Sequence, residues 1–181
     1  YPNMYKIGQS FDTNKAAMID PSPIQNLDYG FDCYATQAFN APDGRALAVS
    51  WLGLPDVEYP SDRFDHQGTL SLVKELTLKD GKLYQYPVPA IKNLRAEEQP
   101  FALSESKNSY ELELKLAADT EHEIVLFADK DGKGLRINFD LKEGQVTVDR
   151  SQAGEPFALD FGTRRNCNID KEATNATIFI D

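Results

Sequence analysis

Apolar and polar residues alternate with a period of two along most of the chain. Over residues 109–116, Tyr110, Leu112, Leu114 and Leu116 are separated by charged residues, and residues 135–141 repeat the pattern. Successive side chains of a strand point to opposite faces of a sheet, so this alternation predicts half-buried antiparallel strands. No longer window keeps the spacing of an amphipathic helix. The sequence therefore predicts an all-β protein.

Three Asp-Gly pairs lie between these β-prone runs, at Asp43-Gly44, Asp80-Gly81 and Asp131-Gly132. Asp-Gly accommodates the positive φ angles of tight hairpin turns, so each pair predicts a hairpin. Hairpins in series build sandwiches, barrels and propeller blades alike, and periodicity does not choose among these architectures.

A change of composition divides the chain near residue 96. Residues 90–100 resemble a short polar helix or linker that is closed by Pro100. Residues 1–95 hold 9 basic and 11 acidic side chains, whereas residues 96–181 hold 10 and 18. We therefore expect two modules, residues 1–95 and residues 96–181.

Charge and hydropathy exclude several classes of protein. The 181 residues carry a formal net charge of −10, and 41% of them are hydrophobic, which is enough for a folded core. Such a charge argues against nucleic acid or a membrane surface as a partner, and no apolar run approaches the length of a spanning helix. The chain begins Tyr-Pro-Asn-Met-Tyr, without Met at its start and without a signal peptide, so we expect an excised piece of a cytoplasmic protein.

The side chains that usually carry chemistry are sparse. Cys33 and Cys167 are expected to be free thiols, and no ligand spacing for a metal or cofactor is present. His66 and His122 fall in different modules, so neither is expected to serve a nucleophile. Asp28 and Asp32, placed on one strand, would lie about 13 Å apart, too far for a pair that hydrolyses a glycoside.

Several motifs nevertheless occur in a recognisable order. They are Leu27-Asp-Tyr-Gly-Phe-Asp-Cys-Tyr-Ala-Thr-Gln37, Asp43-Gly-Arg45, Ser50-Trp-Leu-Gly53, Lys74-Glu-Leu-Thr-Leu-Lys-Asp-Gly-Lys-Leu-Tyr-Gln85 and Pro87-Val-Pro89. In this order the chain resembles glycoside hydrolase family 32, and within it the bacterial enzymes that cleave sucrose 6-phosphate.

The resemblance implies an architecture and a reaction. It implies a five-bladed β-propeller followed by a β-sandwich, with residues 1–95 as the end of blade four and most of blade five. Residues 96–181 would form most of the sandwich, which makes the chain a C-terminal part truncated at both ends. The implied reaction is the retaining hydrolysis of sucrose, sucrose 6-phosphate or other β-fructosides.

The family's catalytic carboxylates have no counterpart in this sequence. They occur in Asn-Asp-Pro-Asn, Arg-Asp-Pro and Glu-Cys contexts, and none of these strings is present. The resemblance therefore implies that the chain holds no catalytic residue and is inactive alone.

Three substrate-binding residues are implied instead: Tyr34, Trp51 and Asp32. A phenol and an indole suit a sugar ring, because they offer a hydrogen bond and an apolar platform. Asp32 and Tyr34 share strand parity, so both are expected to face one pocket. For Trp51 the alternative is a core residue. Cys33 and Thr36 depart from the family pattern, which has Phe and Pro there.

Two other functions remain open from the sequence. One is a β-sandwich that binds carbohydrate without any chemistry. The other is a structural module for dimer contacts, since sheets present edges that pair. Residues 1–95 are also expected to expose an apolar face, which predicts either a homodimer or partial covering of that face by the chain's own sandwich.

Overall fold

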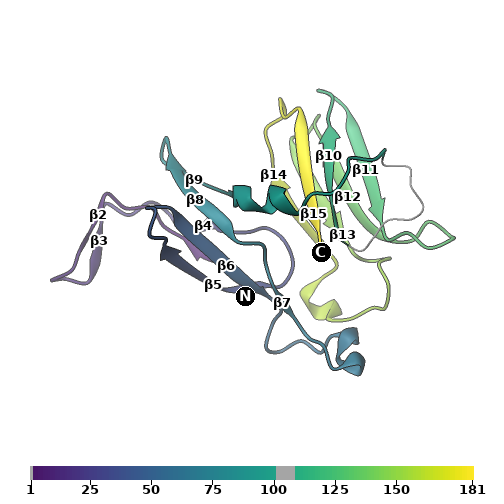
Figure 1. The fold of residues 1–181 in the computed structure, drawn as a ribbon, viewed down its shortest axis with the longest axis horizontal. Helices are drawn as coiled ribbons and strands as arrows, with labels where there is room; N and C mark the ends of the chain where they lie inside the picture. The colour runs from purple at the N-terminus through teal and green to yellow at the C-terminus, as the bar shows by residue number, and fades with distance from the viewer. Residues whose placement is uncertain (1, 101–108) are drawn as a thin grey trace. The chain divides into compact units, whose positions relative to one another are not determined.

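The computed structural model describes residues 2–100 and 109–181 and shows two compact units, Tyr1–Val88 and Pro89–Asp181. Within the described residues every regular element is a β-strand or a short 3₁₀-helix, and all paired strands are antiparallel, so the all-β prediction is confirmed. Each unit is built from its own strands, and no described sheet contains strands of both (Figure 1).

Unit 1 contains nine strands and one 3₁₀-helix. These are β1 (Met4–Tyr5), β2 (Ser10–Asp12), β3 (Ala17–Ile19), β4 (Gln25–Asn26), β5 (Cys33–Asn40), β6 (Ala46–Leu52), η1 (Pro60–Phe64), β7 (Thr69–Leu70), β8 (Lys74–Lys79) and β9 (Lys82–Pro87). Its main sheet has the order β5-β6-β8-β9, while β1 pairs with β4 and β2 with β3.

The hairpins predicted in unit 1 are confirmed. Asp43-Gly44 joins β5 to β6, and Asp80-Gly81 joins β8 to β9. Asp80 has φ 50° and Gly81 has φ 71°, so both central residues of this turn have the positive φ that a tight hairpin requires.

Strand β6 is the central strand of unit 1, and its two ends have different neighbours on one side. Ala46–Ala48 pair with β8, whereas Trp51 and Leu52 pair with β7. Residues 53–68, which we call the β6–β7 loop, therefore leave the sheet and return to it at the Trp51 end. Leu54 and Val57 of this loop are buried, at 4% and 5% exposure.

Unit 2 begins with a 3₁₀-helix, in the segment where the sequence predicted a short helix. Its elements are η2 (Pro89–Leu94), β10 (Tyr110–Lys115), β11 (Glu121–Leu126), β12 (Leu135–Asp140), β13 (Gln145–Asp149), η3 (Leu159–Phe161), β14 (Arg164–Asn168) and β15 (Asn175–Ile180). One sheet has the order β11-β12-β13-β14, and β10 pairs with β15 in a second. Asp131-Gly132 lies between β11 and β12, as predicted.

The two sheets of unit 2 share one hydrophobic core. Buried side chains from β11, β12 and the adjoining turns form its centre: Leu116, Leu126, Ile137, Phe139 and Leu141. Leu112 and Leu114 of β10 and Ile178 of β15 pack against that centre. The period-two alternation in residues 109–116 and 135–141 therefore identified residues that line this core from each of the two sheets.

Candidate functional site

The candidate site is a pair of aromatic side chains at one end of the unit 1 sheet. Tyr34 of β5 and Trp51 of β6 are directly opposite each other in the antiparallel pairing. Their ring centroids are 6.4 Å apart and the ring planes are tilted by 58°. Both residues are half-buried. Side chains opposite each other in an antiparallel pair share a face, so the structure brings these two predicted residues together.

Trp51 also contacts the backbone at the two ends of the β6–β7 loop. A Cβ atom added at Gly53 would come within 2.7 Å of the indole Cε2 atom, and one at Gly68 would clash with the indole nitrogen. Only glycine permits so close an approach. Because the loop ends pack against the indole, Trp51 has a fixed orientation.

Asp32 lies immediately before β5 rather than in it. Its φ is 56°, in the left-handed region, and the backbone carbonyl of Asp32 accepts a hydrogen bond from the Gly53 N–H at 2.7 Å. The prediction that Asp32 and Tyr34 face one pocket assumed that both belong to one strand. That assumption is wrong, because β5 begins at Cys33. The separation of about 13 Å predicted for Asp28 and Asp32 also assumed a strand. It does not apply, because residues 28–32 do not form one.

The Asp32 side chain is nevertheless held at this end of the sheet. Its Oδ2 atom accepts a hydrogen bond of 3.0 Å from the hydroxyl group of Tyr59. Within residues 2–100 and 109–181, Oδ1 accepts no hydrogen bond. One carboxylate oxygen is thus anchored while the other remains an acceptor for a ligand hydroxyl.

A β-bulge follows Tyr34. The pairing register between β5 and β6 shifts between Tyr34 and Gln37, and Ala35 has φ 49°. Thr36, where the family pattern has Pro, donates to or accepts from the buried Ser50 hydroxyl at 2.8 Å. Bulges re-aim side chains and are frequent beside functional sites, so this bulge sets the direction of Tyr34.

Tyr59 is the site residue that sequence reasoning missed. It lies 27 positions after Asp32, in a segment with no alternating pattern, and only the folded β6–β7 loop brings its hydroxyl to the carboxylate. The two prolines that flank this segment, Pro55 and Pro60, indicated a loop but not its contact.

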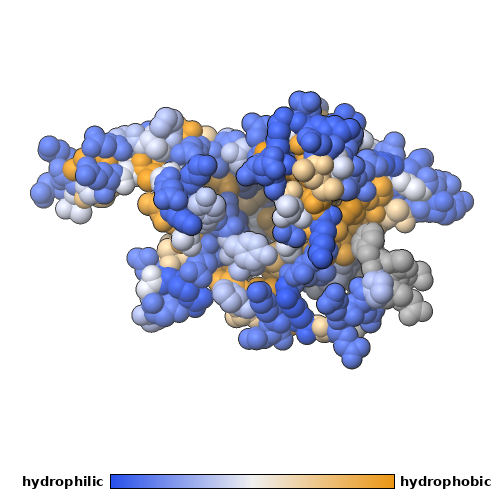
Figure 2. Space-filling model, turned by 90° about the horizontal axis from the view of Figure 1, so that it is seen from above, coloured by the Kyte–Doolittle hydropathy of each residue, from blue (hydrophilic) through white to orange (hydrophobic). Residues whose placement is uncertain are grey.

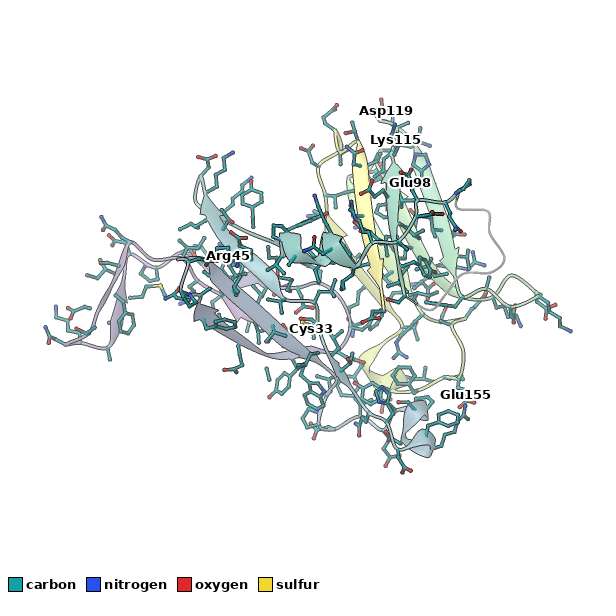
Figure 3. All side chains as sticks on the ribbon, in the orientation of Figure 1. Cys33, Arg45, Glu98, Lys115, Asp119 and Glu155 are labelled. Carbon is teal, nitrogen blue, oxygen red and sulfur yellow. The ribbon has the colours of Figure 1, made fainter. Side chains whose placement is uncertain are left out.

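The remaining candidates lie elsewhere. His66 is exposed in the β6–β7 loop, and the His122 Nε2 atom is 2.6 Å from the Thr120 hydroxyl in unit 2. Cys33, labelled in Figure 3 at the start of β5, and Cys167 are both free. Burial raises the pKa of the Cys167 thiol, which keeps it protonated and unreactive.

The described residues hold neither a metal-binding cluster nor a helix that could span a membrane. In the part of the chain that the structure describes, no three His, Cys, Asp or Glu side chains gather as metal ligands. Across the same residues, no helix has the length and hydropathy needed to cross a membrane.

Comparison with known proteins places these features in a family. Residues 1–87 match the glycosyl hydrolases family 32 N-terminal domain. The chain is 58% identical to a sucrose-6-phosphate hydrolase of Streptococcus mutans, covering 100% of this chain and 38% of that protein. It is 43% identical to a sucrose-6-phosphate hydrolase of Pediococcus pentosaceus, covering 96% of this chain and 36% of that protein.

Solved structures agree with the sequence matches. The sucrose-6-phosphate hydrolase of Lactobacillus gasseri is 42% identical and superimposes with a TM-score of 0.91, over 100% of this chain and 39% of that one. A mutant GH32 β-fructofuranosidase of Bombyx mori, solved in complex with sucrose, is 25% identical with a TM-score of 0.76, over 100% of this chain and 38% of that one. The chain thus spans somewhat more than a third of the length of these relatives.

One expectation from the sequence is corrected by these matches. The chain was expected to be a C-terminal part of a family member, but the domain that residues 1–87 match is the family's N-terminal domain. The motifs quoted between residues 27 and 85 are therefore motifs of that domain. The family match, the identities and the shared all-β fold lead to one conclusion: the chain belongs to glycoside hydrolase family 32.

Proposed function

We propose that the protein to which this chain belongs hydrolyses β-fructosides, with sucrose 6-phosphate as its substrate. The named relatives at 58% and 43% identity are sucrose-6-phosphate hydrolases, which supports this substrate. Sucrose itself is the competing substrate, because a more distant relative was solved with sucrose bound.

The observations that carry the proposal are the Tyr34–Trp51 pair and the Asp32 carboxylate, which lies two residues before Tyr34 and is held by Tyr59. The indole face offers an apolar platform to a fructosyl ring, and the phenol and the carboxylate oxygen Oδ1 offer hydrogen bonds to its hydroxyl groups. These groups bind and orient the sugar. They do not attack it.

The chemistry requires two further carboxyl groups. Retaining hydrolysis uses one carboxylate as the nucleophile and one carboxylic acid to protonate the leaving oxygen, about 5.5 Å apart. The three carboxylate motifs implied by the family resemblance have no match in this sequence, so we assign these groups to the part of the relatives that the chain does not span. The 181 residues alone are then inactive.

The same proposal assigns roles to the two modules. Residues 1–95 form the end of blade four and most of blade five of a five-bladed propeller, and residues 96–181 form a β-sandwich after it. In support, residues 1–87 match the family's N-terminal domain, and the two sheets of unit 2 enclose a core of their own.

Assays of the full-length protein and of the 181-residue chain test the proposal. The full-length protein should release fructose from sucrose 6-phosphate with a higher kcat/KM than from sucrose, while the chain alone releases none from either. Turnover by the purified chain would contradict the assignment of the catalytic groups. Saturable binding of fructose by unit 2 without any turnover in the full-length protein would favour a carbohydrate-binding module.

A further inference from the structure

The Tyr59 side chain joins two parts of the candidate site that are separate in the sequence. Its hydroxyl group donates to Asp32 Oδ2 at 3.0 Å and accepts from the backbone N–H of Leu54, also at 3.0 Å. A hydroxyl group that donates to one group and accepts from another has its hydrogen-bonding direction fixed. Tyr59 therefore links the carboxylate before β5 to the beginning of the β6–β7 loop.

The backbone of Tyr59 is fixed as well. Its N–H donates to the Asp62 carboxylate at 3.2 Å, and its carbonyl oxygen accepts from the Asp62 N–H at 3.0 Å. Asp62 belongs to η1, which opens with Pro60, a residue of restricted φ. The ring of Tyr59 thus projects from a closed turn toward Asp32.

The left-handed backbone of Asp32 is held by contacts from elsewhere in unit 1. A non-glycine residue with φ 56° is uncommon, and such conformations persist where surrounding contacts over-determine them. The contacts here are the Gly53 N–H on the Asp32 carbonyl and the Tyr59 hydroxyl on the carboxylate. Both come from the β6–β7 loop, whose ends also hold the Trp51 indole.

We propose that Tyr59 is a positioning residue for substrate binding, acting by holding the Asp32 carboxylate in place relative to Trp51. This inference rests on the proposed function, in which Asp32 and Trp51 bind the fructosyl group. Tyr59 sets which carboxylate oxygen faces the sugar: Oδ2 is turned toward the phenol, so Oδ1 is the oxygen presented to the sugar hydroxyl.

The test is steady-state hydrolysis of sucrose 6-phosphate by the full-length protein carrying Tyr59→Phe. The ring remains and only the hydroxyl group is lost, so we expect KM to rise about tenfold while kcat stays within about twofold, as for a loss of uniform binding. Asp32→Asn should raise KM to a similar extent. The double variant should raise KM no further than Asp32→Asn alone, because Tyr59 acts on the sugar only through the Asp32 carboxylate, which Asp32→Asn already removes.

A matched control separates positioning from general stability. Tyr5→Phe removes a phenol hydrogen bond of the same length, from Tyr5 to Gln25 Oε1 in the β1–β4 pair. It should lower the melting temperature by less than Tyr59→Phe, which loses two hydrogen bonds, and should leave KM unchanged. Should Tyr59→Phe fail to fold, Asp62→Ala, which frees the Tyr59 backbone, should raise KM about threefold.

The possible results distinguish the two proposals. If Trp51→Phe and Asp32→Asn raise KM while Tyr59→Phe and Asp62→Ala do not, or if the effects of Tyr59→Phe and Asp32→Asn simply add, the positioning role is overturned and the binding site stands. If Trp51→Phe and Asp32→Asn leave KM unchanged, the proposed binding site itself is overturned.

Discussion

The two units of this chain bury their hydrophobic residues to very different extents. Unit 2 encloses a core of five buried side chains, with Leu141 at 0% exposure. Among the described residues, thirteen of the seventeen exposed large hydrophobic side chains lie in unit 1, including Phe39, Leu70, Leu78 and Tyr84. On the face that Figure 2 presents, hydrophobic residues (orange) reach the surface between hydrophilic ones (blue).

The difference separates a unit that encloses a hydrophobic core from one that leaves much of its apolar surface open. Unit 2 closes its own core, as expected of a domain able to fold alone. Unit 1 leaves apolar sheet surface uncovered, and exposed patches of this kind usually mark a place where other protein packs. Since the chain spans somewhat more than a third of the length of its relatives, we expect the remainder of the full-length protein to cover unit 1.

The largest expected effect comes from truncating a leucine in each unit. In the isolated chain, Leu141→Ala should lower the free energy of unfolding by about 2–5 kcal/mol, because it leaves a cavity in the unit 2 core. Leu78→Ala, at 58% exposure in β8, should change it by less than about 0.5 kcal/mol. Urea unfolding followed by circular dichroism measures both.

The same pair of variants in the full-length protein sharpens the comparison. There Leu78→Ala should become destabilising by more than about 1 kcal/mol, because the side chain would be covered. If Leu78→Ala remains neutral at full length, unit 1 is not completed by the rest of the protein.

A second effect concerns the buried hydroxyl groups of unit 1. Ser50 is 1% exposed, and its hydroxyl bonds that of Thr36 in the β-bulge. Ser50→Ala should cost about 1–2 kcal/mol, because the Thr36 hydroxyl loses its buried partner. Ser10→Ala, at an exposed position of β2, is the matched control and should be neutral in the same urea titration.

A third effect is self-association of the isolated chain. Its uncovered unit 1 surface should drive dimerisation, which sedimentation velocity over a range of concentrations detects. The double variant Leu70→Lys and Leu78→Lys should weaken association at least about tenfold by placing charge on that surface. A wild-type chain that stays monomeric at about 100 µM would contradict the idea that this surface is adhesive.

The smallest effect is the acid sensitivity of unit 2. Burial of Asp149 by itself raises its pKa, but the Ser151 N–H and the Arg164 guanidinium favour the carboxylate and hold the pKa below its usual 3.8. This stabilisation is present above pH 3.8 and is lost as the pH falls through the lower folded-state pKa.

Asp149→Asn therefore removes about 1 kcal/mol at pH 6 and flattens the decline in stability below pH 4. Urea midpoints at pH 6 and pH 3 measure the change. If the urea midpoint falls equally between pH 6 and pH 3 in the variant and the wild type, Asp149 does not contribute to the acid sensitivity.

Local patterns predicted the regular part of the fold. The alternation in residues 109–116 is β10, and the Asp-Gly pairs at Asp43, Asp80 and Asp131 all join neighbouring strands. These features depend on side-chain period and on turn geometry, which lie within a few residues of each other.

The candidate site was only partly predictable, because its geometry is set by distant contacts. Tyr34 and Trp51 were found through the family motifs, and the structure pairs them. The left-handed Asp32, the bulge at Ala35 and the Tyr59 hydrogen bond arise from pairing between separate segments. No local pattern encodes such contacts. The alternation of side chains along a strand therefore led to the wrong assumption that Asp32 lies in β5.

The pairing of β6 with β7 has a consequence for how proteins of this kind vary. Because the β6–β7 loop returns to the sheet where it left, its exposed tip near Phe64 is able to gain or lose residues without shifting the register of any strand. The entropic penalty for closing a longer loop grows only slowly with length. Insertions at this tip would therefore change the loop whose ends hold the Trp51 indole while the sheet beneath stays the same.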